Sequence, residues 1–429
     1  MRKRYLNVLM LIFSVIGGLI GYIVGEVLIN CFVYRIPNVV LVGLYFSVFS
    51  FCVVIMCFIA ECIKPRLTCA NWLKDNFKIN MLAVIPTMIV VMFAVGCFTQ
   101  FIYGLNVKSV ETLEYDDYVF LMDNSGSMYS SDPNNLRITQ IDKLIDELDT
   151  SKRIGYYAFG SDVDKAFDLQ PVNDSSKKAM HQAIYETVSD GGTDIENALV
   201  TAFNDVQSKL DPNRTTALVL ISDGEDSFDT QPIIDQCRRN NVLISCIGLG
   251  TSVFSSGRIM SELADGTGGN YYDIQSASQI IGVFTNIKDH TTSTRLLLER
   301  RYSSERNNAL LGIERVLFIS VFGVLLGLAL GIVFDNKHLA RNLIIGGIVT
   351  GLLAGLSMEI GLFAYFNPRF CRMWMDILLS LVVCLFTAVI AYEIPQNNAG
   401  NGNLHGYDAL EGQKFSDKNH DIDTTIMRF

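Results

Sequence analysis

Long apolar runs divide the chain into three parts. Six of these runs have close to the ~20 residues that a helix needs to cross a bilayer, and they form two groups of three on either side of a polar middle. The runs span residues 7–29, 38–60, 81–103, 315–334, 343–365 and 373–392. The pattern therefore predicts two membrane regions, 1–104 and 315–392, and a separate domain between them.

The hydrophobic pattern changes between residues 105 and 290, where short apolar runs alternate with amphipathic stretches. The first run, at 118–122, is followed by a stretch at 136–148 whose apolar residues recur at helical spacing. The alternation predicts further strands at 154–159, 166–169, 216–221, 242–248 and 270–274, and helices at 175–187, 195–210, 231–239, 258–264 and 276–288. Such alternation predicts an α/β fold, a doubly wound and mostly parallel sheet with helices on both faces, inserted between two groups of three transmembrane helices.

Oxygen-bearing side chains follow two of these strands. The segment Asp123-Asn-Ser125-Gly-Ser127 follows the first strand, Asp223 follows the fourth, and Thr193 lies in the loop before the third helix. Ligands of parallel sheets gather at the carboxyl ends of the strands, so the fold brings these residues together. Magnesium favours about six oxygens and keeps water or a partner's oxygen among them. The segments predict a hard-cation site, although a Gly/Ser turn after a strand is the alternative for the first of them.

Asp-x-Ser-x-Ser with a distant Thr and Asp resembles the metal-ion-dependent adhesion site of the von Willebrand factor type A (VWA) family. All five expected positions are present, namely Asp123, Ser125, Ser127, Thr193 and Asp223, and the resemblance covers roughly residues 112–290. It implies that Asp123 and the two serines contribute oxygens, that Thr193 joins or leaves with conformation, and that Asp223 often acts through water. It also implies Mg²⁺, with Ca²⁺ or Mn²⁺ as alternatives, and a protein partner that offers an acidic side chain. Five nearby residues are expected to be solvated loop residues, with an N-cap role for the third: Asn124, Asp190, Asp194, Glu225 and Asp226.

Charge and reactive residues narrow the function of the middle domain. It carries 29 acidic and 14 basic side chains, which argues against nucleic acid as a partner because phosphate binding needs a basic face. His181 and His290 are isolated, and no phosphate-cradling Gly-x-x-x-x-Gly-Lys loop occurs. Most of the cysteines lie in or beside the apolar runs, without the spacing of a disulfide framework or a zinc site. The domain is therefore not expected to be an enzyme.

Glycines recur at four-residue spacing in three of the apolar runs. Gly17, Gly21 and Gly25 lie on one helix stripe, and the fourth and fifth runs repeat the pattern with Gly323, Gly327, Gly331, Gly347, Gly351 and Gly355. Such stripes predict close helix packing in one bundle, although glycine is also simply common in membrane helices. Glu26 and Glu359 lie nearer the ends of their runs than the middle, and such acids raise the alternative of an ion or proton path.

Two polar segments follow the middle domain and the last apolar run. Residues 291–314 are rich in Arg and Glu and predict a charged juxtamembrane helix, either a solvated stalk or a transmitter of movement to the membrane. The tail at 393–429 is rich in Asn, Gly and Asp and is expected to be disordered. Its paired threonines, Thr424 and Thr425, resemble phosphothreonine peptides that forkhead-associated domains read in bacterial kinase systems, which makes such a domain a possible partner of the tail.

Six spans would place both termini on one side of the membrane and the middle domain on the other. Lys and Arg near the span ends tie between the two orientations, and the cluster of Arg2, Lys3 and Arg4 before the first span breaks the tie. We therefore expect a multi-pass plasma-membrane protein, of bacterial type, with cytoplasmic termini and an extracytoplasmic VWA domain. The leading hypothesis is metal-dependent protein binding, in adhesion, scaffolding or assembly; the alternative is a regulatory or pore-forming subunit of a transporter or channel that the domain gates.

Overall fold

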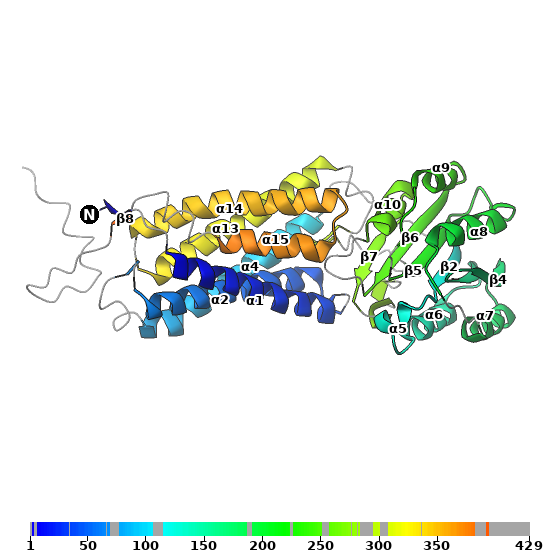
Figure 1. Ribbon diagram of the computed structural model, residues 1–429, viewed down its shortest axis with the longest axis horizontal. Helices are drawn as coiled ribbons and strands as arrows, with labels where there is room; N and C mark the ends of the chain where they lie inside the picture. Colours follow the sequence, from blue (N-terminus) through cyan, green and yellow to red (C-terminus); the bar gives the residue numbers. More distant parts are fainter. Residues whose placement is uncertain are drawn as a thin grey trace, which may run out of the picture.

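The molecule is elongated, with a helical bundle at one end and an α/β domain at the other (Figure 1). The computed structural model describes residues 2–3, 7–33, 35–65, 67–68, 77–105, 115–186, 191–223, 226–250, 257–275, 277–280, 282–283, 295–300, 308–335, 337–381 and 392–393. The predicted disordered tail, apart from residue 393, lies outside these ranges.

The domain is built on a six-stranded sheet in the order β4-β3-β2-β5-β6-β7. Its strands are β2 (Asp117–Asp123), β3 (Arg153–Phe159), β4 (Val163–Pro171), β5 (Thr216–Ser222), β6 (Val242–Leu249) and β7 (Tyr271–Ile274). All neighbouring pairs are parallel except β3 with β4, which confirms the predicted α/β fold with a mostly parallel sheet. The edge strand β4 is longer than predicted because most of its outer residues are exposed or half-buried, so apolar residues mark only part of it.

Helices cover both faces of this sheet. They are α5 (Met128–Ser131), α6 (Leu136–Glu147), α7 (Asp174–Glu186), α8 (Ile195–Gln207), α9 (Gln231–Arg239) and α10 (Arg258–Thr267). Side chains alternate across β2, so that Phe120 packs in the cluster with α6 and α7 while Leu121 packs in the cluster with α8, α9 and α10. Within the helix predicted at 276–288, the structure describes a 3₁₀ turn, η2 (Ala277–Gln279), and residues 284–288 lie outside the described ranges.

The bundle consists of long apolar helices. They are α1 (Val8–Phe32), α2 (Asn38–Ile63), α4 (Ile85–Gly104), α13 (Ala309–Val333), α14 (Lys337–Phe363) and α15 (Pro368–Ser380), and a π-helical turn, η1 (Asn80–Val84), precedes α4. Five helical stretches of the described chain are long and apolar enough to cross a membrane: Val8–Phe32, Asn38–Ile63, Phe77–Gly104, Ala309–Val333 and Leu339–Phe363. The expected sixth span begins within α15, but residues 382–391 are outside the described ranges. A sixth crossing, and with it the arrangement of three spans on each side of the domain, stays a prediction.

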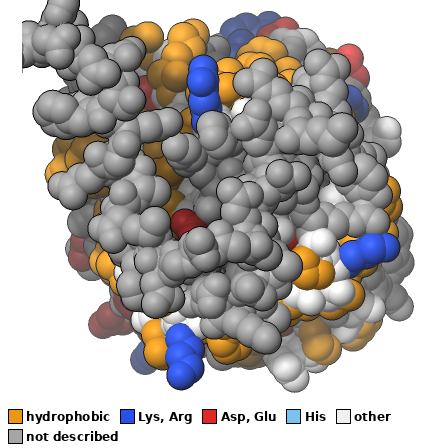
Figure 2. Space-filling view, turned by 90° about the vertical axis from the view of Figure 1, so that its left-hand side faces the viewer, with side chains coloured by type: hydrophobic (Ala, Val, Ile, Leu, Met, Phe, Trp, Pro, Cys, Tyr) orange, Lys and Arg blue, Asp and Glu red, His pale blue; other side chains and the backbone are white. Residues whose placement is uncertain are grey.

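The segment before the first bundle helix pairs with a segment that follows the last one, at the end of the bundle far from the domain. A short strand, β1 (Arg2–Lys3), pairs antiparallel with β8 (Tyr392–Glu393), and both lie at the end of the bundle opposite the α/β domain (Figure 1). Figure 2 looks onto this end, where both basic and acidic side chains are visible around residues that are not described. Residues near both ends of the membrane part therefore share one end of the bundle.

Pro86 lies in the first turn of α4, directly after the π-helical turn. A proline ring inside an α-helix clashes with the carbonyl four residues earlier and removes one hydrogen bond. In the π-helical turn the hydrogen bonds join residues five positions apart, so the backbone just before Pro86 departs from regular α-helical geometry. The helix therefore continues past Pro86 to Gly104.

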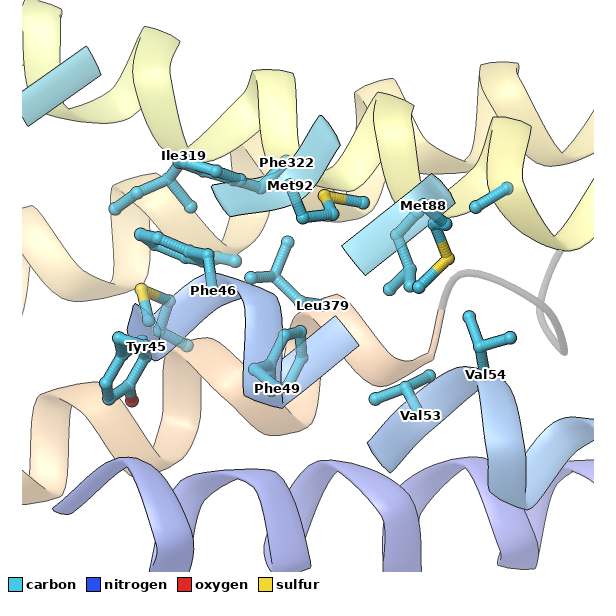
Figure 3. Close-up of a cluster of buried hydrophobic side chains, with 14 of the residues drawn as sticks. Tyr45, Phe46, Phe49, Val53, Val54, Met88, Met92, Ile319, Phe322 and Leu379 are labelled. Carbon is cyan, nitrogen blue, oxygen red and sulfur yellow. The ribbon is translucent and has the colours of Figure 1, made fainter. Parts of the chain in front are cut away.

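The glycine stripes lie at helix contacts, which confirms the prediction of close packing. A Cβ atom added to Gly323 would meet the backbone of Gly347 and Gly351, so α13 and α14 touch backbone to backbone. On α1, Gly17 and Gly21 approach the α2 backbone in the same way, whereas Gly25 lies against the Tyr45 ring. Elsewhere the interior is filled by large side chains, and the stacked rings of Phe46 and Phe322 have centroids 3.6 Å apart (Figure 3).

The segment at 295–300 differs from the predicted charged helix. It forms a turn, and Leu296, Leu297 and Leu298 are fully buried in the core of the bundle. Its backbone is bound by the bundle: Gln100 accepts from Leu297 N at 3.0 Å and donates to the Arg295 carbonyl at 2.7 Å. The interpretation of this stretch as a solvated stalk is therefore wrong over 295–300, because three consecutive leucines are buried within it.

Both acids of the membrane helices are paired with arginine. Glu26 on α1 binds the Arg372 guanidinium through both carboxylate oxygens. Glu359 on α14 accepts from Arg300 and from Arg315, whose Nε also donates to the Leu297 carbonyl at 3.0 Å. These contacts give the acids a structural role at the domain end of the bundle, and they do not support the alternative of an ion or proton path.

Candidate metal centre

Asp123 forms the buried base of the candidate site. It is the last residue of β2 and is fully buried. One carboxylate oxygen accepts a hydrogen bond from the backbone N–H of Ser125 at 2.8 Å, which turns the chain back over the strand end. The other accepts from the hydroxyl of Ser222, the last residue of the neighbouring strand β5. The parallel pairing of β2 with β5 thus holds the carboxylate in a fixed orientation.

A chain of oxygens leads from this base to the surface. The hydroxyls of Ser125 and Ser127 lie 3.0 Å apart, and Ser127 donates to Asp223 Oδ1 at 3.0 Å. Ser125 is buried, whereas Ser127 is exposed and Asp223 is half-buried. The structure therefore brings four of the five predicted residues together in a site that is closed on the sheet side and open toward solvent.

The fifth residue, Thr193, lies in a loop against the serine turn. The backbone N–H of Gly126 donates to the Gly191 carbonyl at 3.1 Å, and Thr193 follows two residues later, half-buried. Gly191 has a φ of 102°, a conformation that glycine adopts readily. The hydroxyl of Ser161 accepts from Gly192 N at 2.7 Å and fixes this loop from the other side. Thr193 is adjacent to the oxygen cluster through its loop.

The spacing of these oxygens fits a small divalent cation. Mg²⁺ binds oxygens at 2.0–2.1 Å in octahedral geometry, so neighbouring ligands lie about 2.9 Å apart. The separations of 3.0 Å between Ser125 and Ser127, and between Ser127 and Asp223, match that edge length. Hydrogen bonds between the hydroxyls have the same length and hold this spacing as well. Among the described residues no group of three or more His, Cys, Asp or Glu side chains is arranged to hold a metal ion, and hydroxyl groups would supply most ligands here.

The electrostatics of the site also favour a cation. Burial raises the pKa of the Asp123 carboxyl, and the negative charge of Asp223 adds to this rise, while hydrogen bonds from Ser125 and Ser222 oppose it. A buried carboxylate beside a second carboxylate is costly unless a positive charge offsets them. A divalent cation supplies that charge, so the residues present fit the metal that the motif implies.

Several supporting contacts were missed by the sequence interpretation. Ser131 donates to Asp223 Oδ2 at 2.9 Å, and it could have been found because it lies four residues after Ser127, on the same face of a helical turn. Asn124 is buried and accepts from Arg137 at 3.1 Å, so the expectation of a solvated loop residue is wrong for Asn124. Asp226 accepts from the first backbone N–H of α8 at 2.8 Å.

Asp194 has the N-cap role that the sequence predicted. Its side chain accepts from Asn197 N at 2.9 Å, at the start of α8. Asp190 and Glu225 lie outside the described residues. The cap fixes the start of the helix that follows the Thr193 loop.

Comparisons with known proteins identify the family that the α/β domain resembles. Residues 117–286 match the family model of the von Willebrand factor type A domain, so the chain contains such a domain. A von Willebrand factor A domain-containing protein of Dictyostelium discoideum is 28% identical over 152 residues, which cover 34% of this chain and 16% of that protein. The mouse calcium-activated chloride channel regulator 1 is 28% identical over 151 residues, which cover 35% of this chain and 16% of that protein.

A solved structure has a similar fold over part of its length. It is proximal thread matrix protein 1 from the mussel byssus with a zinc-occupied metal-ion-dependent adhesion site, with a TM-score of 0.33 and 18% identity, covering 42% of this chain and 48% of that one. The chain thus spans only a small part of the length of the curated relatives it matches.

Proposed function

We propose that this chain is a membrane-anchored binding protein whose VWA domain holds a divalent cation and, through it, an acidic side chain of a protein partner. The convergence of Asp123, Ser125, Ser127 and Asp223 at adjacent strand ends carries the proposal. Thr193 in the adjacent loop is the fifth proposed ligand. Mg²⁺ is the expected ion, with Ca²⁺ or Mn²⁺ as alternatives.

Each residue contributes in a way that its contacts support. Asp123 supplies negative charge at the buried side, and its bonds to Ser125 and Ser222 orient it. Asp223 is oriented by the hydroxyls of Ser127 and Ser131, in a position suited to holding water or a hydroxyl beside the ion. A bound cation would supply an open coordination position for an outside carboxylate.

The placement of the site in the molecule suggests the direction of approach. The strand order puts β7 nearest the bundle and β4 farthest from it (Figure 1). The short helix α5, which follows the serine turn directly, lies on the flank of the domain in the same view. The site, at the ends of β2 and β5, lies midway between these two edges, so a partner that reaches the metal approaches from the side of the domain.

Metal titration of the full-length protein in detergent tests this function. We expect calorimetry to detect Mg²⁺ binding to the parent and to Asp235→Ala, a control that removes an exposed acid on α9. Asp123→Ala should abolish binding, because it removes the buried charge that offsets dehydration of the ion. Thr193→Ala should weaken metal-dependent capture of membrane proteins from host cells while it keeps some metal affinity. Capture of the same proteins at undiminished strength by Asp123→Ala in Mg²⁺ and by the parent in EDTA would exclude the proposed role of the metal.

The proposed orientation places the domain outside the plasma membrane and both termini in the cytoplasm. The cluster of Arg2, Lys3 and Arg4 before the first span supports this assignment. A membrane-impermeant thiol reagent should label Tyr185→Cys on α7, an exposed position, in intact cells, and should not label Ser416→Cys in the tail. Labelling of the tail alone would reverse the topology.

A second candidate function is regulation of transport by the domain. It is favoured by direct polar contacts between the α/β domain and the bundle. Arg369, in the first turn of α15, donates to Asp273 of β7 at 2.9 Å, and Gln279 donates to the Asn30 carbonyl at 2.6 Å. A change at the domain therefore has a physical path to the helices. Ion flux through liposomes that contain the purified protein, with and without Mg²⁺, separates this function from partner binding alone.

A further inference from the structure

Asp223 has a hydrogen-bond donor on each of its two carboxylate oxygens. The Ser127 hydroxyl donates to Oδ1 at 3.0 Å, and the Ser131 hydroxyl donates to Oδ2 at 2.9 Å. Ser127 is one of the five positions of the motif, whereas Ser131 is not. Together the two hydroxyls fix the rotation of the Asp223 carboxylate, because turning it toward a new ligand would break a hydrogen bond.

Ser131 is itself held in place from two sides. It is the last residue of α5, and the backbone N–H of Asp132 closes this turn on the Met128 carbonyl at 2.8 Å. On the other side it packs against Gly250, which follows β6, and a Cβ added to that glycine would lie 3.3 Å from the Ser131 Cβ. The Ser131 hydroxyl is therefore fixed between the end of β6 and Asp223.

The other acid of the site, Asp123, is restrained in a comparable way. One of its oxygens accepts from the Ser125 backbone N–H and the other from the Ser222 hydroxyl. Each carboxylate of the site thus has both oxygens bound by donors on fixed elements. Neither Asp123 nor Asp223 can turn both oxygens toward one ion without losing a hydrogen bond.

This restraint distinguishes between divalent cations of different size. Ca²⁺ takes about 6–8 oxygens and often binds a carboxylate through both of its oxygens, whereas Mg²⁺ takes about six in octahedral geometry and keeps several waters. Asp123, the two motif serines and Thr193 offer one side-chain oxygen each, and water or a partner's oxygen completes a set of about six. A larger set requires Asp223 to turn toward the ion, which its hydrogen bond from Ser131 opposes.

We propose that Ser131 determines the ion selectivity of the site: it keeps Asp223 out of direct contact with the ion and so favours a small six-coordinate cation, Mg²⁺ or Mn²⁺, over Ca²⁺. Ser131 acts through Asp223 and is a positioning residue. This role rests on the proposed metal binding, and it adds the class of ion and the side chain that selects it.

Metal titrations of the full-length protein in detergent compare Mg²⁺ with Ca²⁺ in each variant. The parent should bind Mg²⁺ more tightly. Ser131→Ala frees Asp223 Oδ2 and should raise the Ca²⁺ affinity relative to the Mg²⁺ affinity about tenfold, the scale of one hydrogen bond to a charged group. Adding Asp223→Asn to Ser131→Ala should abolish this gain, because the freed carboxylate is its source. Ser130→Ala, which removes the exposed neighbouring hydroxyl of α5, is the matched control and should keep the ratio of the parent.

The ratio of the two affinities separates selectivity from stability, since both ions are measured on the same folded protein. Equal weakening of both ions in Ser131→Ala would mean that the hydroxyl only supports the loop, and would overturn the proposal. An unchanged ratio in Ser131→Ala, with Mg²⁺ binding intact in the parent, would exclude the role of Ser131 and leave the proposed function standing. A parent that prefers Ca²⁺ would also overturn the proposed selectivity. A parent that binds neither ion would overturn the proposed function together with it.

Discussion

The domain and the bundle bury their charged groups in different ways. In the domain, charged residues lie at the two ends of the apolar strand β2: Asp117 at one end accepts from Arg153 and Arg214, and Asp123 at the other forms the base of the candidate metal centre. In the bundle, charged residues lie within the helices, where Arg372 binds Glu26 from a helix that is distant in sequence. In the domain, the charged side chains are therefore positioned by the ends of strands. In the bundle, they are positioned by the way neighbouring helices align.

This difference has an energetic consequence. Charges at strand ends remain close to water or to loops that can adjust, as the exposed Ser127 beside Asp223 illustrates. Arg315 is almost completely buried and donates hydrogen bonds to Glu359, the Tyr103 hydroxyl and the Leu297 carbonyl. A buried ion of this kind needs every partner, because its desolvation is expensive. We therefore expect single substitutions to cost more in the bundle than in the domain.

The largest effect is expected from breaking a buried pair in the bundle. Arg372→Ala leaves the Glu26 carboxylate buried without its partner, and such a loss costs about 3–5 kcal/mol. Thermal unfolding of the full-length protein in detergent measures it, with Arg258→Ala, which removes an exposed arginine of the domain, as the control. The double variant Glu26→Gln with Arg372→Met should recover much of the loss. A cost for Arg372→Ala no larger than that of the control would contradict the contrast between the regions.

A smaller effect is expected from overfilling the contact between α13 and α14. A Cβ at Gly327 would meet the carbonyl of Leu343, whereas a Cβ at Gly104 would meet nothing within 4 Å. Gly327→Ala should therefore destabilise the bundle by about 1–3 kcal/mol, as overpacking does. Gly104→Ala should be neutral, and the two variants compare the same chemical change in the same detergent. Equal unfolding temperatures would mean that the helices separate at little cost.

The sequence was sufficient for much of the domain fold and for the convergence of four of the five candidate ligands, for reasons that the contrast explains. Buried strands are recognisable as continuous apolar runs. Residues at the carboxyl ends of parallel strands lie at the same edge of the sheet, independently of the loop conformations, so the sequence could predict that Asp123 and Asp223 lie close together. The VWA resemblance added Thr193, whose loop the structure places beside the serine turn.

Other features depend on contacts that no local pattern encodes. The buried turn at 295–300 appears charged in sequence, and only the positions of Gln100, Arg315 and Arg372 in three different helices make its burial favourable. The burial of Asn124 likewise depends on Arg137, which lies 13 residues further along the chain. Such pairs follow from tertiary packing, which a single sequence does not specify.

The smallest effect is expected at His181 on α7, which appeared isolated in the sequence. Its two ring nitrogens bind Asp142 and Asp146 of α6, the second at 3.1 Å. Burial lowers the pKa of His181, but hydrogen bonds and charges from the two aspartates outweigh it, so the pKa is raised above the ordinary value of 6.5. The protonated ring therefore stabilises the fold, by about 0.5–1 kcal/mol for a partly exposed pair.

The raised pKa fixes the sign of the pH dependence. The contribution of His181 is complete below the unfolded pKa of about 6.5 and is lost as pH rises through the higher folded value. His181→Gln should therefore lower the unfolding temperature of the domain most at pH 5.5 and progressively less toward pH 8.5. Asp142→Asn, which removes the charge of one partner, should reduce the pH dependence while leaving the histidine in place. If the difference in unfolding temperature between His181→Gln and the parent stays constant across this range, the ring stabilises the domain by packing alone. Surface charge would then contribute even less to the stability of the domain than the comparison with the bundle implies.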